Sequence, residues 1–124
     1  MSDTVAERVA RGAALLDIHD PQWWRRDVRS PIDLKALDLD SPCKCVLGQR
    51  HPTTRKQSPW NRGLQLLGLR PYWGHGNAVT DADCGFNSRF ESVREDEPCP
   101  ERDDDIAALK AEWVRVITER RAAS

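Results

Sequence analysis

The sequence predicts a small, mainly α-helical single domain, and three observations support this fold class. Apolar residues recur at helical spacing near both ends of the chain, helix-capping signals precede these runs, and strand signals are poor. The chain has 124 residues, which is enough for one domain with a modest core. We therefore expect a helical bundle over residues 1–124 with long irregular loops. A short hairpin near residues 70–90 stays open.

The first helix is predicted to begin after Thr4 and to end near Asp20. Thr4 and Glu7 fit a capping box, in which each side chain bonds a backbone N–H of the first turn. Pro21 disfavours a helical conformation at the residue before it. One apolar stripe follows the cap at helical spacing, made of Val5, Val9, Ala13 and Leu16.

Three Ser-Pro pairs are interpreted as helix starts, with serine as N-cap and proline at the first helical position. The first, Ser30-Pro31, predicts a short helical piece over residues 32–37. The second, Ser41-Pro42, precedes residues 43–49 and predicts a helical turn there, for which Gly48 is the natural stop. The third pair, Ser58-Pro59, predicts a helix with Trp60, Leu64 and Leu67 on its buried face and Gly68 just after its end.

The last helix is predicted to follow an acidic loop over residues 94–105, where Pro98 and Pro100 oppose regular structure. Its aspartates at the start and arginines near the end suit the helix dipole. We expect this helix to pack against the first one, with the Trp60 helix across both. Its buried face should comprise Ile106, Leu109, Trp113 and either Val116 or Ile117. The expected core residues are Trp113, Leu16, Leu34, Val46, Leu47 and Leu67.

The charges are segregated along the chain. Residues 41–80 carry six basic and no acidic side chains, so in a chain of net charge -1 the remainder carries -7. An exposed basic loop is expected at residues 50–57. Such a block suits nucleic acid or an acidic protein surface, although near-neutral overall charge is unusual for a dedicated nucleic-acid domain. Pairing with the acidic segment of the same chain is the alternative.

The four cysteines and the first residues bear on the compartment and on metals. The N-terminal residues lack the basic and apolar regions of a secretion signal, and no apolar run approaches the length of a membrane span. We therefore expect a cytoplasmic protein without membrane contact, whose thiols are reduced. We expect no bound cofactor, with Cys45 or Cys84 as a small buried side chain and Cys99 exposed in the acidic loop. The alternative is a zinc site, for which the candidate ligands are Cys43, Cys45, Cys84 and His51.

A catalytic site has only weak support in the sequence. His75 lies between two glycines in an aromatic-flanked loop and could exchange protons, with Cys45 or Cys84 as nucleophile. No third group that would orient such a pair is identifiable. The alternative is a glycine-rich turn with an exposed histidine.

Trp23 and Trp24 are adjacent, so both cannot face one core. One of them should lie at the surface, covered by an arginine or available to a partner.

The chain resembles a group of small uncharacterised proteins from actinobacteria and their phages. The resemblance rests on Arg11 to Asp17, on Cys43-x-Cys45-Val46-Leu47-Gly48-Gln49, on Gly85-Phe86-Asn87 and on the terminal helix. The resemblance implies an actinobacterial or phage origin, and it indicates no particular activity.

The sequence thus favours a non-enzymatic binding protein that recognises a host or viral macromolecule, most readily a protein, through basic and aromatic loops. The alternatives are a zinc-supported nucleic-acid-binding module and, less favoured, a Cys/His enzyme. The expected partner-binding residues are Trp24, Arg50, Arg55, Lys56, Arg70, Trp73 and His75.

Overall fold

The protein is mainly α-helical, as the sequence predicts. A computed structural model describes residues 4–39, 41, 44–50, 64, 67–68, 80, 82–87 and 100–123. Their elements are the helices α1 (Val5–His19), α2 (Val46–Arg50) and α4 (Pro100–Ala123), with the short 3-10 helix η1 (Ala82–Cys84). Within these ranges, no helix has the length and apolar character that crossing a membrane requires.

Helix α1 has the predicted cap and the predicted end. The Thr4 hydroxyl accepts a hydrogen bond from the Glu7 backbone N–H at 3.1 Å and donates to the Glu7 carboxylate, which satisfies an N–H of the first turn. At the other end, the Asp20 N–H donates to the Leu16 carbonyl at 2.7 Å before Pro21. Local chemistry therefore fixes both boundaries.

Helix α4 begins earlier than predicted. The acidic segment 94–105 was expected to be a loop, but its part from Pro100 onwards is helical. The expectation was wrong because proline in the first turn removes only an N–H that has no helical partner, and acidic side chains there suit the helix dipole. Leu109, Trp113 and Ile117 form the buried face, so Ile117 and not the half-buried Val116 completes it.

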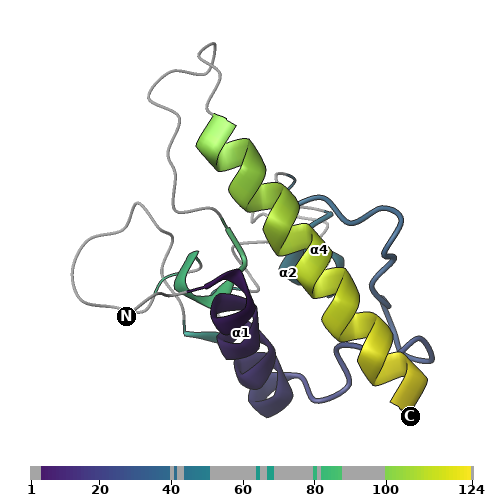
Figure 1. Ribbon diagram of the computed structural model, residues 1–124. Helices are drawn as coiled ribbons and strands as arrows, with labels where there is room; N and C mark the ends of the chain where they lie inside the picture. Colours follow the sequence, from purple (N-terminus) through teal and green to yellow (C-terminus); the bar gives the residue numbers. More distant parts are fainter. Residues whose placement is uncertain are drawn as a thin grey trace, which may run out of the picture.

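Helices α1 and α4 pack side by side and run in the same direction (Figure 1). Their first halves are joined by Arg8 and Asp105, and their last turns by Asp17 and Arg120. This confirms the expected pairing of the first and last helices. The parallel direction means that the chain between them must return along the bundle, and η1 and α2 belong to this return.

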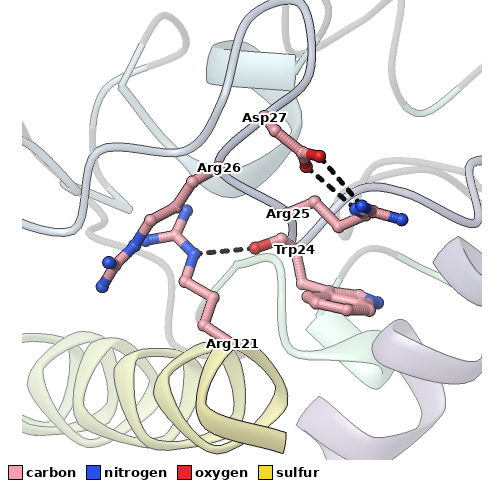
Figure 2. A pocket seen from close by; sticks show the side chains of 5 residues that line it. All are labelled: Trp24, Arg25, Arg26, Asp27 and Arg121. Carbon is pink, nitrogen blue, oxygen red and sulfur yellow. Dashed lines mark hydrogen bonds and ion pairs between the residues drawn. The ribbon is translucent and has the colours of Figure 1, made fainter. Parts of the chain in front are cut away.

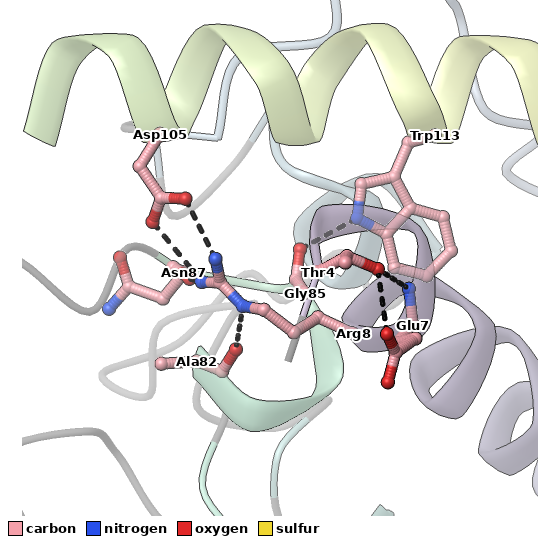
Figure 3. Close-up of polar contacts among 8 residues, drawn as sticks. All are labelled: Thr4, Glu7, Arg8, Ala82, Gly85, Asn87, Asp105 and Trp113. Atoms are coloured by element: carbon pink, nitrogen blue, oxygen red, sulfur yellow. Dashed lines mark hydrogen bonds and ion pairs between the residues drawn. The ribbon is translucent and has the colours of Figure 1, made fainter. Parts of the chain in front are cut away.

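Trp113 lies at the centre of the core and is fully buried. Phe86 stacks on its ring at 5.2 Å between centroids, and Trp23 meets it edge-on at 5.7 Å. Its indole N–H donates to the Gly85 carbonyl at 2.7 Å, so the one polar atom of the ring is satisfied (Figure 3). Burying side chains of this size stabilises the fold by about 1.5–3 kcal/mol each.

Two glycines allow the segment of η1 to approach α1 closely. A Cβ on Gly12 would lie 2.1 Å from the Cys84 carbonyl oxygen. Gly85 has φ +76°, a left-handed conformation, and a Cβ there would lie 3.0 Å from Val9. Both positions therefore require glycine for packing between elements far apart in sequence.

Arg8 is a buried charge that the sequence analysis did not identify (Figure 3). Its guanidinium pairs with Asp105 through two contacts of 2.7 and 3.2 Å, and both side chains are less than a tenth exposed. It also donates to the carbonyls of Ala82 at 2.9 Å and Asn87 at 3.0 Å. One side chain thus ties α1 to α4 and to the η1 segment, and its charge is both paired and hydrogen-bonded.

The segment after α1 is irregular and is held by side chains from two helices. The predicted helix over residues 32–37 is absent: Ser30 has φ 56°, and Asp33 closes a turn by accepting from the Lys35 N–H. Side chains take the local backbone groups instead. Gln49 bonds the N–H and the carbonyl of Asp33, and Arg121 donates to the Ile32 carbonyl.

The remaining predictions about helix ends and core residues are mostly confirmed. The predicted stop at Gly48 was wrong, because α2 continues through it to Arg50. Gly68 does have the left-handed φ of 71° expected after a helix end. Five of the expected core residues are buried and Leu34 is half-buried. Trp60 and the Ser58-Pro59 start lie outside the described residues. Near 70–90, the structure describes only a β-bridge at Thr80 and the segment 82–87.

Candidate partner-binding surface

The Trp pair divides between the core and the surface, as predicted. Trp23 is fully buried, and its indole N–H donates to the Asp17 carboxylate at 3.0 Å. Arg120 covers the same ring, with its guanidinium carbon 5.3 Å from the ring centroid. Trp24 is only half-buried and packs on the edge of the core. The polypeptide thus anchors one indole and leaves the other at the surface.

Trp24 forms part of a surface pocket of about 230 Å³, which we call the Trp24 pocket. The pocket lies where the segment after α1 crosses the end of α4 (Figure 2). Its lining combines one aromatic ring with a strongly cationic rim. The residues are Trp24, Arg25, Arg26, Asp27 and Arg121.

Arg121 is fixed in the Trp24 pocket by the backbone. It donates to the carbonyls of Trp24 and Ile32, both at 2.7 Å, which pins the segment to the last turns of α4. Burial lowers the pKa of its guanidinium, and the positive charge of Arg26 lowers that pKa further. The negative charge of Asp33 raises this pKa, but its effect is smaller than that of Arg26. Two cationic groups therefore face each other at this site.

Arg25 and Asp27 form a pair that is complete in itself. Two hydrogen bonds of 2.9 Å join the guanidinium to the carboxylate. This bonding raises the pKa of Arg25 and lowers the pKa of Asp27. Both side chains are exposed, so their contribution to stability is small. Because Asp27 is paired with Arg25, it does not compensate the charge of Arg26.

Arg26 is the exposed cation of the pocket. Across the part of the chain that the structure describes, no hydrogen bond or ion pair holds its side chain. Figure 2 shows this side chain alongside that of Arg121. The arrangement can accept an anionic group, since a negative charge between the two guanidiniums would relieve their repulsion.

Arg50 was predicted to lie at the start of an exposed basic loop, and this placement was wrong. Its side chain is 9% exposed and pairs with Asp20 through two contacts of 2.8 Å. It also donates to the carbonyls of Arg29 at 2.7 Å and Ser30 at 3.1 Å. As the last residue of α2, Arg50 reaches inward and holds the irregular segment. The other predicted binding residues lie outside the described residues: Arg55, Lys56, Arg70, Trp73 and His75.

Neither of the two described cysteines, Cys45 and Cys84, is in a disulfide, and both are buried, which agrees with the expectation for these two residues. Cys45 accepts a hydrogen bond from the Gly48 N–H at 3.2 Å. Within the described ranges, no group of three histidine, cysteine or acidic side chains could hold a metal ion. Cys43 and His51, the other candidate ligands, lie outside those ranges.

A second surface depression, of about 290 Å³, lies between α1 and α4. Its floor is made of small side chains, and its rim is made of charges that pair with each other. Arg115 bonds Glu112 and Glu119 on its own helix, and Arg120 bonds Asp17 across the groove. Its charges are therefore already compensated, in contrast to those of the Trp24 pocket.

Trp24 was predicted from the sequence, whereas the arginines near the end of α4, Arg121 among them, were assigned only to the helix dipole. The sequence places Arg26 next to the Trp pair, but it does not show that Arg26 has no carboxylate partner among the described residues. The spacing of residues 26 and 121 gave no signal, because only the tertiary fold brings them together.

Compared with protein-family models, with curated proteins and with solved structures, the chain gives no match.

Proposed function

We propose that this is a non-enzymatic binding protein of actinobacterial or phage origin that works in the cytoplasm. It recognises a partner protein through the Trp24 pocket. The observation that carries the proposal is a half-buried tryptophan bordered by three arginines, of which one has no partner in the described structure.

The composition of the pocket supports a role in protein recognition. Tryptophan and arginine are the residues most enriched among those that dominate binding energies at protein interfaces. An indole that is already packed on one side loses little conformational freedom on binding. Arg121, held by two carbonyls, is also positioned in advance. A partner would therefore meet a rigid surface.

The charge pattern supports an acidic partner surface. A cationic patch attracts acidic proteins and raises their association rate. The net charge of -1 gives the whole chain no general attraction for a polyanion such as nucleic acid. Arg55, Lys56, Arg70, Trp73 and His75 remain part of the proposal as loop residues that extend the binding surface.

Chemistry at the described cysteines has little support. Cys45 and Cys84 are buried, with exposures of 2% and 1%, whereas a catalytic thiol must reach its substrate. The burial of these groups favours the binding role over a Cys/His enzyme.

A quantitative pull-down from an actinobacterial lysate tests the proposal. The baits are the native protein, Trp24→Ala, Arg26→Glu and the control Arg29→Glu, which changes an exposed arginine outside the pocket. Truncating an interface tryptophan typically costs about 2 kcal/mol or more, so the partner should be depleted about 30-fold with Trp24→Ala. Arg26→Glu should deplete the same partner, and Arg29→Glu should retain it.

Two results would decide against the proposal. Partner recoveries that are equal for the native and Trp24→Ala baits would remove the role of the pocket. Equal losses for Arg26→Glu and Arg29→Glu would show a dependence on total charge alone. Thermal unfolding of each bait checks that Trp24→Ala, which alters a residue packed on the core, is still folded.

A further inference from the structure

We propose that the Trp24 pocket binds a carboxylate side chain of an acidic peptide segment between Arg26 and Arg121, with an apolar neighbour of that carboxylate packed against Trp24. This inference rests on the proposed function and names the ligand chemistry of the same site.

Two like charges lie together in the pocket. Arg26 lies alongside Arg121 (Figure 2), and among the residues that the structure describes neither Asp27 nor Asp33 lies between the two guanidiniums as a shared partner. Asp27 is occupied by Arg25, and Asp33 influences Arg121 less than Arg26 does. Two guanidiniums on one side of a pocket provide planar forks that match the two oxygens of a carboxylate.

The backbone holds one of the two cations in place. Arg121 is bound to the carbonyls of Trp24 and Ile32 at 2.7 Å each. These bonds hold it beside Arg26, and its pKa is lowered by burial first and by repulsion from Arg26 second. A ligand anion would therefore meet one donor already in place and would have to order only the exposed Arg26.

The composition of the lining favours a carboxylate over a phosphate chain. Trp24 lines the same pocket as the cations, with its carbonyl bound to Arg121 and its indole directed away from Arg26 and Arg121 (Figure 2). An acidic side chain with an apolar neighbour uses both features, whereas a sugar–phosphate backbone uses only the charge. The carboxylate of Asp27 on the rim opposes a doubly charged group more than a singly charged one.

Binding of a synthetic peptide to the full chain tests this inference. The probe is a fluorescein-labelled peptide of alternating leucine and glutamate, capped at both ends, followed by fluorescence anisotropy. The matched ligand carries glutamine at every glutamate position. Hydrogen bonds to charged groups imply that the glutamine peptide binds at least about tenfold more weakly. The Trp24 indole N–H resonance, assigned with Trp24→Phe, should shift with the glutamate peptide.

Protein variants locate the site. Arg26→Gln should weaken binding of the glutamate peptide at least about tenfold, because it removes a guanidinium from the carboxylate. Arg29→Gln removes the same charge three residues away and should change the affinity by less than about twofold, as expected for a screened charge. Arg26 has no partner in the described structure, so Arg26→Gln should fold normally.

Several outcomes would overturn the inference. Equal affinities for the two peptides, no binding of either, or an unchanged affinity of Arg26→Gln would each do so. Tighter binding of a single-stranded oligonucleotide that also depends on Arg26 would assign the pocket to phosphate instead. A partner recovered by Arg26→Glu and lost with Trp24→Ala would overturn this inference and leave the proposed function standing. The proposed function fails separately if Trp24→Ala recovers the same partner as the native protein.

Discussion

Replacing Gly12 by alanine in the middle of α1 should destabilise the protein, although helix propensity alone predicts the opposite. Alanine in a helix interior is favoured over glycine by about 0.8–1 kcal/mol. In this fold, the added Cβ would lie 2.1 Å from the Cys84 carbonyl oxygen, and real Cβ contacts are not shorter than 3.0 Å. The tertiary contact therefore reverses the sign of the substitution.

The magnitude follows from what has to move. The clashing atom belongs to the backbone of η1 and cannot rotate away as a flexible side chain could. Phe86 and Trp113 each lie 3.1 Å from the new Cβ, so neither leaves room for a shift. Overpacking of this kind costs about 1–3 kcal/mol and sometimes more. Displacing the η1 segment also weakens hydrogen bonds worth about 1 kcal/mol each, such as that between Trp113 and Gly85. After the gain in propensity, we expect a net loss of about 1–3 kcal/mol.

Urea unfolding followed by tryptophan fluorescence measures this loss, since Trp113 lies beside the perturbed contact. Two control variants separate the contributing effects. Ala14→Gly changes an exposed position of the same helix and should cost about 0.5–1 kcal/mol through propensity alone. Gly68 has φ +71°, and no atom of the described residues lies within 4 Å of a Cβ added there. Gly68→Ala should therefore cost about 1–2 kcal/mol through backbone strain alone.

A Gly12→Ala protein as stable as the native one, or more stable, would refute the reasoning. It would mean that α1 and η1 do not approach each other as closely as described. A loss no larger than that of Ala14→Gly would refute the estimate of its size.

Three further predictions concern the ion pairs. Asp105→Asn should lower the free energy of unfolding by about 3–5 kcal/mol, because it leaves the buried Arg8 guanidinium without its counter-charge. Replacing both Arg8 and Asp105 by apolar residues should recover much of this loss, and urea unfolding measures both changes. Arg50→Met should expose the segment between α1 and α2 to limited proteolysis, whereas Arg25→Met, which breaks an exposed pair, should leave the cleavage rate unchanged. The hydrogen bond from Arg120 lowers the pKa of the Asp17 carboxyl in the folded protein. The stabilisation that this bond provides is present above the pKa of Asp17 in the unfolded chain, and it is lost as the pH falls through the pKa of Asp17 in the folded protein. The stability difference between native protein and Asp17→Asn should therefore shrink between about pH 5 and pH 3 in urea unfolding, and a difference that stays constant would contradict this assignment.

Much of the helical framework could be predicted because its determinants are close in sequence. The Thr4 cap, the Asp20 end and the stripe of Leu109, Trp113 and Ile117 depend on neighbours within one or two turns. The error at Ser30 has the opposite cause. Ser-Pro is compatible with a helix start, but side chains from α2 and α4 bind the backbone there and stabilise an irregular path.

The candidate site was only half accessible to prediction. Adjacent tryptophans required that one lie at the surface, and Trp24 does. Arg50 was misassigned because the sequence shows its charge but not its burial. That burial accompanies its contacts with Asp20 and with two carbonyls distant in sequence. The positive charge of residues 41–80 is a property of the sequence, whereas the group that each cation contacts is a property of the fold.

The sequence by itself determined the helical class, the caps, the buried face of α4 and the division of the Trp pair. These depend on backbone geometry and periodicity, which act over a few residues. Only the tertiary structure decided that Arg8 and Arg50 are buried and that Arg26 and Arg121 meet beside Trp24. The reason is that desolvation and Coulomb energies depend on which groups surround a charge in the fold, and these groups come from residues 20 to 97 positions away in the sequence.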